Sequence, residues 1–152
     1  MIEYKKATLL DIPKMQDLVK PEVDKGIILF RSSDEMATNI RSYILALKNE
    51  ELKGFGALHF HAPNLAEVRS LVVSKDVRGE GVGSSIVKVL LDEARAFGVE
   101  QVFTLTYEKG FFEKLNFKEI PKEELPAHKI WADCIKCKYF PVCEEIALIY
   151  YL

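Results

Sequence analysis

The sequence lacks a long apolar run and an amino-terminal targeting segment. None of its 152 residues belongs to a stretch approaching the ~20 consecutive apolar residues that a membrane-spanning helix needs. The first residues, Met1 to Lys6, also lack the apolar core of a signal peptide. We therefore expect a soluble, cytoplasmic protein with no membrane partner.

An excess of charge of one sign is also absent. The chain has 21 basic and 23 acidic residues, a formal net charge of -2, which argues against non-specific nucleic-acid binding. Hydrophobic residues make up 49% and charged residues 29%, a balance typical of a folded globular protein rather than a disordered one. With no internal repeat, this length predicts one domain over residues 1–152.

Cysteine is scarce, and its three copies all lie in the last twenty residues, at Cys134, Cys137 and Cys143. An odd number does not suggest a disulfide framework. Together with His128, these thiols have the chemistry of tetrahedral zinc ligands, whereas packed thiols or a redox-sensitive pair are the alternatives. Whether the tail loop over residues 126–145 binds a metal therefore stays open.

Hydrophobic patterning predicts an alternation of strands and helices. Strands are expected over residues 2–7, 43–48, 52–60, 65–73, 102–106 and 146–151. Helices are expected over residues 11–21, 34–42, 82–97 and 110–115. The first helix should stop near Pro21, and Gly98 should end the long third helix. This order predicts a mixed α/β layer fold, with a mostly antiparallel central sheet flanked by helices.

The most informative segment is a glycine-rich turn between a strand and the long helix. Gly79, Gly81 and Gly83 alternate there, and free N–H groups at the start of a helix suit phosphate oxygens. The dinucleotide-binding pattern fails because Ser84 and Ile86 occupy the positions of its last glycine, and the P-loop pattern fails as well. An Arg-x-x-Gly-x-Gly pattern remains, which alone would also suit an ordinary strand-to-helix connection.

This turn resembles the acetyl-CoA-binding turn of the GNAT-type N-acetyltransferases. The segment Gly110–Phe117 is similar to a second marker of that family, a short helix with an aromatic-Glu-Lys-Leu-Gly-Phe pattern. The resemblance implies that turn amides hold the CoA pyrophosphate and that the preceding strand pairs with the pantetheine arm. The acetyl-CoA contacts that it implies are Leu71, Val72, Val73, Arg78, Gly79, Glu80, Gly81, Val82, Gly83 and Ser84.

Three further segments resemble the short, single-domain bacterial N-acetylglutamate synthases. They are Leu29–Ser32, Leu65–Leu71 and His128–Glu145, the last with a Trp-x-Asp-Cys-x-x-Cys core. The resemblance implies direct acetyl transfer from acetyl-CoA to the α-amine of L-glutamate, the first step of arginine biosynthesis. It also implies a homodimer. Since 152 residues cannot hold the amino-acid-kinase-like domain of the longer enzymes, feedback inhibition through that domain is not expected.

The resemblance also assigns roles around the acceptor. The cationic amine of glutamate must lose a proton before it can attack, and Glu67 is the expected base. An ion pair with Arg69 on the same strand face is the alternative for this carboxylate. The two carboxylates of glutamate need cations, and the substrate-binding residues are expected to be Arg31, Arg69, Ser70 and Lys129.

One departure concerns the leaving group. Many members of the family place a tyrosine in the second marker helix to protonate the CoA thiolate, but this chain has Phe112, or Phe111 in a shifted register. Tyr107 and Thr106 are the candidate substitutes. Alternatively no acid is needed, because a thiol with a pKa of about 8.5 is a tolerable leaving group.

Other interpretations remain open at this point. The first is an acetyltransferase whose acceptor is another amino acid or a small amine. The second is a non-catalytic acetyl-CoA sensor, and the third is a small zinc-stabilised interaction module. A backbone N–H of Leu71 or Val72 is the expected oxyanion donor if transfer takes place. His59 and His61, near the end of a strand, are interpreted as structural.

Overall fold

A computed structural model of the chain describes residues 1–125 and 145–152. The strands in this part are β1 (Ile2–Lys6), β2 (Tyr43–Lys48), β3 (Glu51–Ala62), β4 (Leu65–Val73), β5 (Gln101–Thr106), β6 (Lys118–Ile120) and β7 (Ile146–Tyr151). The α-helices are α1 (Ile12–Asp24), α2 (Ser33–Thr38), α3 (Val82–Phe97) and α4 (Lys109–Glu113). Short 3₁₀ turns stand at Leu9–Asp11, Ile40–Ser42, Lys75–Val77 and Lys122–Glu124.

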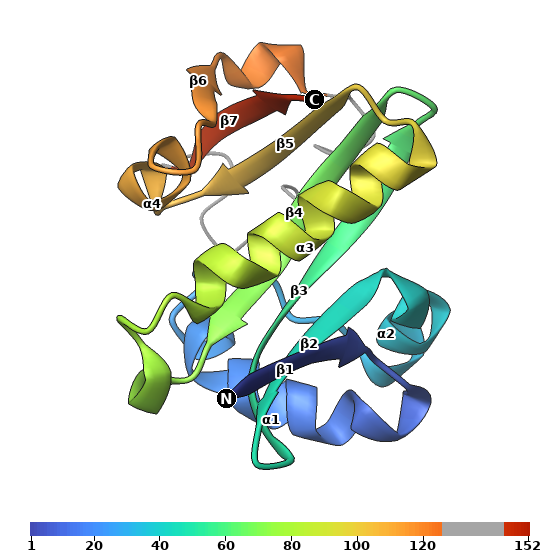
Figure 1. Ribbon diagram of the computed structural model, residues 1–152, viewed down its shortest axis with the longest axis vertical. Coiled ribbons are helices and arrows are strands. Elements are labelled where there is room, and N and C mark those ends of the chain that lie inside the picture. Colours follow the sequence, from blue (N-terminus) through green and yellow to red (C-terminus); the bar gives the residue numbers. More distant parts are fainter. Residues whose placement is uncertain (126–144) are drawn as a thin grey trace.

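The strands form one sheet in the order β1-β2-β3-β4-β5-β7-β6. Every neighbouring pair is antiparallel except β4 and β5, which run parallel. The amino-terminal strands lie at one end of the sheet and the carboxyl-terminal strand β7 near the other (Figure 1). The predicted mixed α/β fold with a mostly antiparallel sheet is confirmed.

Three details of the predicted elements were wrong. The helix expected over residues 34–42 ends at Thr38 as α2, and a separate 3₁₀ turn follows over Ile40–Ser42. Helix α1 continues past Pro21 to Asp24. Proline lacks an N–H and so removes one hydrogen bond from the helix, but the Pro21 carbonyl still accepts a hydrogen bond from the Lys25 N–H at 3.1 Å. Strand β6 was not expected, because its three mostly exposed residues show no alternation of apolar and polar side chains. The predicted end of α3 is confirmed: Gly98 follows it with a φ of 85°.

Helix α3 covers one face of the sheet, crossing β3 and β4 diagonally (Figure 1). Its buried side chains include Ile86 and Leu90, which pack into the largest apolar cluster of the described residues. Two glycines of β3 permit this close approach, because a Cβ at Gly56 would lie 3.0 Å from Ile86 and one at Gly54 would lie 3.3 Å from Ile86. This face is therefore a continuous apolar core.

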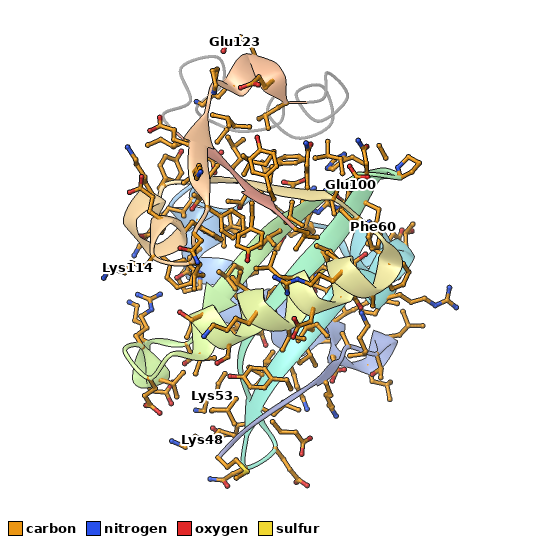
Figure 2. All side chains as sticks on the ribbon, turned by 45° about the horizontal axis from the view of Figure 1, so that its top comes forward. Lys48, Lys53, Phe60, Glu100, Lys114 and Glu123 are labelled. Carbon is orange, nitrogen blue, oxygen red and sulfur yellow. The ribbon has the colours of Figure 1, made fainter. Side chains whose placement is uncertain are left out.

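The opposite face is divided. Helices α1 and α2 cover one half, where Met15, Leu45 and Phe55 belong to a second apolar cluster. A third, smaller cluster around Phe103 and Ile149 covers the half near β5 and β7. Strand β3 spans this division, and Figure 2 labels Lys53 near its beginning and Phe60 near its end. None of the helices in the described ranges combines the length and apolar character that a membrane crossing requires.

Candidate active site

Strands β4 and β5 separate after a short region of contact. Their parallel pairing runs from Leu65 opposite Gln101 to Glu67 opposite Phe103, although β4 continues to Val73. The Thr104 hydroxyl donates a buried hydrogen bond of 2.8 Å to the Val68 carbonyl at the point of separation. Figure 1 shows the two strands diverging from there toward their carboxyl ends. Within the described residues, the β5-facing edge of the second half of β4 therefore carries no strand ladder and is available to an extended ligand.

The glycine-rich turn lies at the carboxyl end of this open edge. Gly79 and Gly81 have φ values of 86° and 79°, in the left-handed region that favours glycine, and Gly81 is the N-cap of α3. The first N–H groups of any helix have no intrahelical acceptor, so those of Val82 to Ser84 are directed outward as donors. A Cβ at Gly83 would lie 3.3 Å from the Phe111 ring, so this glycine permits α4 to pack against α3. The geometry suits the binding of a phosphate group.

Two charged side chains fasten the turn to its surroundings. The Arg78 guanidinium contacts the Val73 carbonyl at 3.4 Å and the Glu22 carboxylate of α1 at 3.2 Å. Glu80 lies 3.8 Å from the ammonium of Lys48. Arg78, expected from the resemblance to contact acetyl-CoA, therefore also links the turn to the carboxyl end of the open edge and to α1.

A β-bulge at Ser70 changes the direction of β4 beside the open edge. Ser70 and Leu71 together stand opposite Gly56, between the pairs Arg69–Ala57 and Val72–Phe55. Ser70 has a φ of 57°, uncommon for a residue with a side chain. The extra residue reverses the alternation: Val68 faces α3 before the bulge, whereas Leu71 faces α3 after it.

A cavity of about 440 Å³ adjoins the bulge. It lies between α1, the segment before α2, and strands β2 to β4, and Ser70, Tyr43 and Arg31 are among its lining residues. Burial raises the pKa of the Tyr43 phenol, while the cationic Arg31 and Arg69 partly oppose this rise, as does a side-chain hydrogen bond to Ser70. Tyr43 is therefore held protonated at neutral pH as a hydrogen-bond donor beside two cations.

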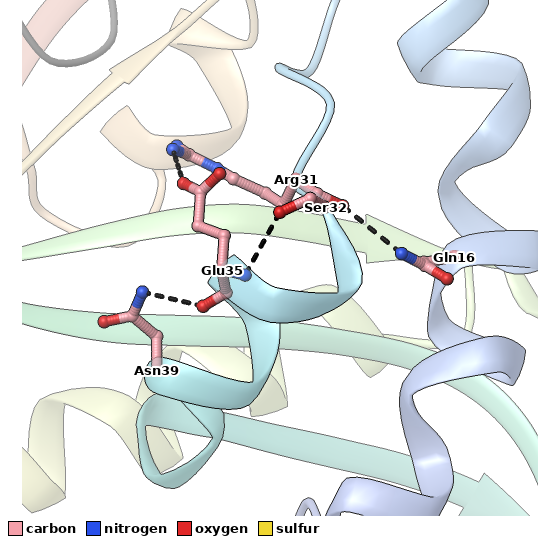
Figure 3. Close-up of polar contacts among 5 residues, drawn as sticks. All are labelled: Gln16, Arg31, Ser32, Glu35 and Asn39. Carbon is pink, nitrogen blue, oxygen red and sulfur yellow. Dashed lines mark hydrogen bonds and ion pairs between the residues drawn. The ribbon is translucent and has the colours of Figure 1, made fainter.

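Arg31 is fixed in place by its neighbours (Figure 3). Its guanidinium is 2.8 Å from the Glu35 carboxylate, and its side chain is only 12% exposed. The Gln16 amide of α1 donates to the Arg31 carbonyl at 3.3 Å, and the Ser32 hydroxyl caps α2 by accepting from the Glu35 N–H at 3.1 Å. Asn39 completes the cluster by donating to the Glu35 carbonyl at 3.0 Å. The Arg31 guanidinium therefore lines the cavity as one member of an ion pair with Glu35 that its neighbours hold in place.

The expected base, Glu67, is buried in the interior. It is 1% exposed, and its Oε1 atom lies 2.8 Å from Nε2 of His61, a side chain that is itself 3% exposed. Sequence reasoning had interpreted this histidine as structural and weighed Arg69 as the partner of the carboxylate. The structure therefore adds a second titratable group to the neighbourhood of the expected base.

The residues expected to protonate the leaving group lie at the carboxyl end of β5, beyond the part of β5 that pairs with β4. The Thr106 hydroxyl, at the end of β5, accepts from the Glu108 N–H at 2.9 Å and so closes a turn. Tyr107 directly follows the strand. Phe112 is 3% exposed and packs edge-on against Phe117 at a centroid distance of 5.1 Å, as a member of the core.

Some predicted residues lie outside the described part of the chain. They are Lys129, expected to bind the acceptor, and the candidate zinc ligands His128, Cys134, Cys137 and Cys143. Among residues 1–125 and 145–152, no three histidine, cysteine, aspartate or glutamate side chains are grouped closely enough to hold a metal ion.

Sequence reasoning missed the place of Tyr43 beside the cavity and did not predict the contact between His61 and Glu67. Tyr43 is the first residue of an apolar strand, and its sequence neighbours suggest an ordinary core residue. No signal in the nearby sequence indicates that it lies close to Ser70. The alternation of β3 did place His61 on the same face as His59, but pairing with β4 is what brings it to Glu67.

Comparison with known proteins supplies a family. The acetyltransferase (GNAT) family profile matches residues 12–117. An N-acetyltransferase from Chlorobaculum tepidum is 35% identical over 147 residues, covering 94% of this chain and 92% of its own length. An amino-acid acetyltransferase from Mycobacterium tuberculosis is 31% identical over 119 residues, covering 76% of this chain and 68% of its own.

Among solved structures, N-acetylglutamate synthase from Neisseria gonorrhoeae superposes with a TM-score of 0.91. The match covers all of this chain, at 23% identity, and 35% of the neisserial chain. At that identity the likeness shows the fold. The present chain thus spans about a third of the length of this neighbour.

Proposed function

The chain belongs to the acetyltransferase (GNAT) family, and on that premise we propose that it transfers the acetyl group of acetyl-CoA to the α-amine of L-glutamate. The amino-acid acetyltransferase of Mycobacterium tuberculosis and the neisserial synthase, solved with coenzyme A and N-acetyl-glutamate, support this choice. The observation that carries the proposal is the cavity, with Arg31 in its lining, that meets the open edge of β4 at Ser70. The product would begin arginine biosynthesis, in the cytoplasm.

Acetyl-CoA is proposed as the co-substrate held along β4 and the turn. The edge of β4 beyond Glu67, which has no strand partner among residues 1–125 and 145–152, offers backbone groups to the pantetheine arm. The outward N–H groups from Val82 to Ser84 suit the pyrophosphate. The pantetheine arm would run along the last residues of β4, which are Leu71, Val72 and Val73. The thioester would then lie near the bulge, next to the cavity.

The acceptor is proposed to occupy the cavity. Arg31 would bind one carboxylate, the protonated Tyr43 would donate to it, and Arg69 lies close enough to act on the Tyr43 phenol. Ser70 lines the cavity and bonds to Tyr43. Lys129, predicted from the resemblance, remains a proposed second cation.

The proposed chemistry takes the roles of Glu67 and Tyr107 from the family resemblance. Glu67 takes one proton from the ammonium of the acceptor, which leaves a neutral amine with a lone pair. The amine attacks the thioester carbonyl, and a backbone N–H of Leu71 or Val72 stabilises the developing oxyanion. The C–S bond then breaks, and the proton still carried by the attacking nitrogen passes to the thiolate, with Tyr107 as the proposed intermediary.

A second acceptor class is favoured by one observation. Arg31 is already paired with Glu35, and the other charged side chains in the lining are Asp17, Lys20 and Asp24. Among the charged residues of the lining, Arg31 and Lys20 balance Asp17 and Asp24, which suits an amino acid with a single carboxylate, such as one with an amide side chain. Acetylation of such an amino acid is the alternative within the same family.

The deciding experiment measures CoA release with acetyl-CoA and each of the twenty amino acids, with mass detection of the acetylated product. Selective turnover of L-glutamate supports the proposal, and preferential turnover of another amino acid replaces the acceptor while keeping the reaction. Acetyl-CoA binding without release for any acceptor would instead indicate a sensor or a macromolecular acceptor.

A matched pair of variants tests the acceptor site. Arg31→Ala should raise KM for the acceptor roughly tenfold to a hundredfold, because a hydrogen bond to a charged group is worth about 1.5–3 kcal/mol. Arg41→Ala, at an exposed arginine of the turn after α2, should leave KM unchanged. Equal behaviour of the two variants would remove Arg31 from the site.

A further inference from the structure

The carboxyl end of α1 is fixed by a set of backbone hydrogen bonds. Gly26 follows the helix with a φ of 75°, and its N–H donates to the Val23 carbonyl at 3.0 Å. The Ile27 N–H donates to the Glu22 carbonyl at 2.9 Å, and the Ile28 N–H contacts the same oxygen at 3.3 Å. The bonds of Gly26 and Ile27 are those of a Schellman motif, with glycine at its left-handed position. The chain that leaves α1 is therefore attached to the backbone of Glu22.

The segment over residues 27–31 leads from this helix end to the cavity. Ile28 and Arg31 are among the lining residues of the cavity, whereas Glu22 is not. The Gln16 amide of α1 donates to the Arg31 carbonyl at 3.3 Å (Figure 3). The segment is thus bonded to α1 near both of its ends, at Glu22 and at Gln16. A change in the position of the helix end therefore displaces Arg31 as well.

The carboxylate of Glu22 contacts the glycine-rich turn. Its Oε1 atom lies 3.2 Å from Nη2 of Arg78, and its side chain is 16% exposed, against 53% for Arg78. The helix dipole disfavours a negative charge in the last turn of a helix, and the last turn of α1, which lies wholly within the described residues, has no basic residue to offset it. Arg78 supplies that positive charge. The turn, rather than the helix, therefore accounts for the place of this carboxylate.

We propose that Glu22 is a positioning residue that couples the two substrate sites. Its carboxylate holds Arg78 of the acetyl-CoA turn, and its carbonyl holds the segment that brings Arg31 to the acceptor cavity. When acetyl-CoA occupies the turn, Arg78 is fixed, so the helix end and the segment after it are already ordered when the acceptor arrives. The inference rests on the proposed function in one respect, the assignment of these two sites to acetyl-CoA and the acceptor.

The experiment measures the Kd of L-glutamate, or of the amino acid that the panel selects in its place, with and without saturating coenzyme A. Calorimetry with coenzyme A instead of acetyl-CoA avoids turnover. In the wild type, coenzyme A should tighten acceptor binding about fivefold or more, which is the usual lower range for coupled sites. Glu22→Gln should reduce this factor to less than about twofold, because the amide keeps the size of the side chain and loses its charge. A wild-type factor of one, or an unchanged factor in Glu22→Gln, overturns the proposal.

Coupling is reciprocal, which gives the same experiment an internal check. The acceptor should tighten the binding of coenzyme A by the same factor in the wild type. In an Arg78→Ala background, adding Glu22→Gln should change neither the factor nor the affinity for the acceptor, since the partner of the carboxylate is already absent. An effect of Glu22→Gln that persists in that background does not pass through the ion pair and overturns the proposal.

Asp92→Asn is the matched control. It removes the charge of an exposed carboxylate that pairs with Arg95 at 2.9 Å on α3, and it should keep the wild-type coupling factor. If Asp92→Asn loses the coupling to the same extent as Glu22→Gln, the effect follows from the loss of any surface ion pair, and Glu22 has no special place in it.

Hydrogen exchange separates this inference from the proposed function, because it needs no acceptor. Coenzyme A alone should slow amide exchange at Ile27 and Ile28 in the wild type, and should not do so in Glu22→Gln. Turnover of L-glutamate by an enzyme without this protection defeats only the inference. Protection in the wild type, lost in Glu22→Gln, with no turnover of L-glutamate supports the link from the turn to the segment and defeats the proposed acceptor.

Discussion

The two faces of the sheet differ in kind although the same strands build both. Beneath α3 the side chains form one apolar cluster, closed tightly enough that Gly54 and Gly56 have no room for a Cβ without displacing neighbours. The other face is interrupted, with Glu67 and His61 buried between two separate clusters. The face under α3 contributes mainly to stability. The opposite face has a less continuous apolar core because it holds buried ionisable groups.

Strand β4 shows how one segment supplies both faces. Its alternation sends Ala66 and Val68 under α3 and Glu67 to the other side. The bulge at Ser70 then reverses that alternation, so Leu71 and the strand beyond remain packed under α3 while Ser70 reaches the cavity. Polar groups thus gather on one face without any break in the apolar core on the other.

The largest effect is expected on the polar face. Glu67→Gln should lower kcat by about 100-fold to 10,000-fold, the usual contribution of a general base, because an amide cannot accept the proton. Its free energy of unfolding should change by less than about 1 kcal/mol, since glutamine has nearly the same shape and can still bond to His61. Steady-state kinetics and urea unfolding of the same preparation measure both quantities.

Glu3→Gln, at an exposed carboxylate of β1 far from the site, is the control and should match the wild type in both measurements. If Glu67→Gln instead loses stability and rate in parallel, the assignment of separate roles to the two faces is broken.

On the apolar face the expected effect is on stability. Leu90→Ala removes a fully buried side chain of α3 that lies over Gly56, and should cost about 2–5 kcal/mol of unfolding free energy. Lys88→Ala, two residues earlier on the exposed side of the same helix, should stay within about 0.5 kcal/mol. At a temperature where Leu90→Ala remains folded, its kcat should equal that of the wild type, and a lower kcat would show that the α3 face also shapes the site.

The smallest effect concerns Tyr43 and alkaline pH. Because burial raises the pKa of this phenol in the folded state, its contribution to stability is complete below the unfolded value of about 10 and is lost as the pH rises toward the folded value. Hydrogen bonds to carboxylates also raise the pKa values of Lys53 and Lys109. Their contributions to the stability of the protein are likewise lost as the pH rises. Only a difference between variants isolates the tyrosine.

Tyr43→Phe should therefore unfold with a shallower loss of stability between about pH 9.5 and pH 11 than the wild type. Tyr151→Phe, at a tyrosine that is 59% exposed, should retain the wild-type slope. Urea unfolding followed across this pH range decides the matter, and identical slopes in all three proteins would show that Tyr43 is not protected by burial.

Local signals account for the parts of the fold that could be predicted. The periodicity that ends at Gly98 located α3, and the run from Ile146 to Tyr151 is a strand. Each of these depends on neighbours within a few residues along the chain. The continuation of α1 past Pro21 could not be predicted in the same way, because the packing of the whole helix on the sheet outweighs one missing donor.

The candidate site divides along the same line. The sequence by itself determined most of the elements and the glycine turn, whose left-handed φ values favour glycine. Through a family resemblance it also gave candidate roles to Glu67, Arg31 and Ser70. Only the tertiary structure decided the divergence of β4 from β5, the bulge, the cavity beside Tyr43 and the contact between His61 and Glu67. The physical reason is range: a turn or a cap is fixed by adjacent residues, whereas a register or a buried pair exists only once distant strands are brought together.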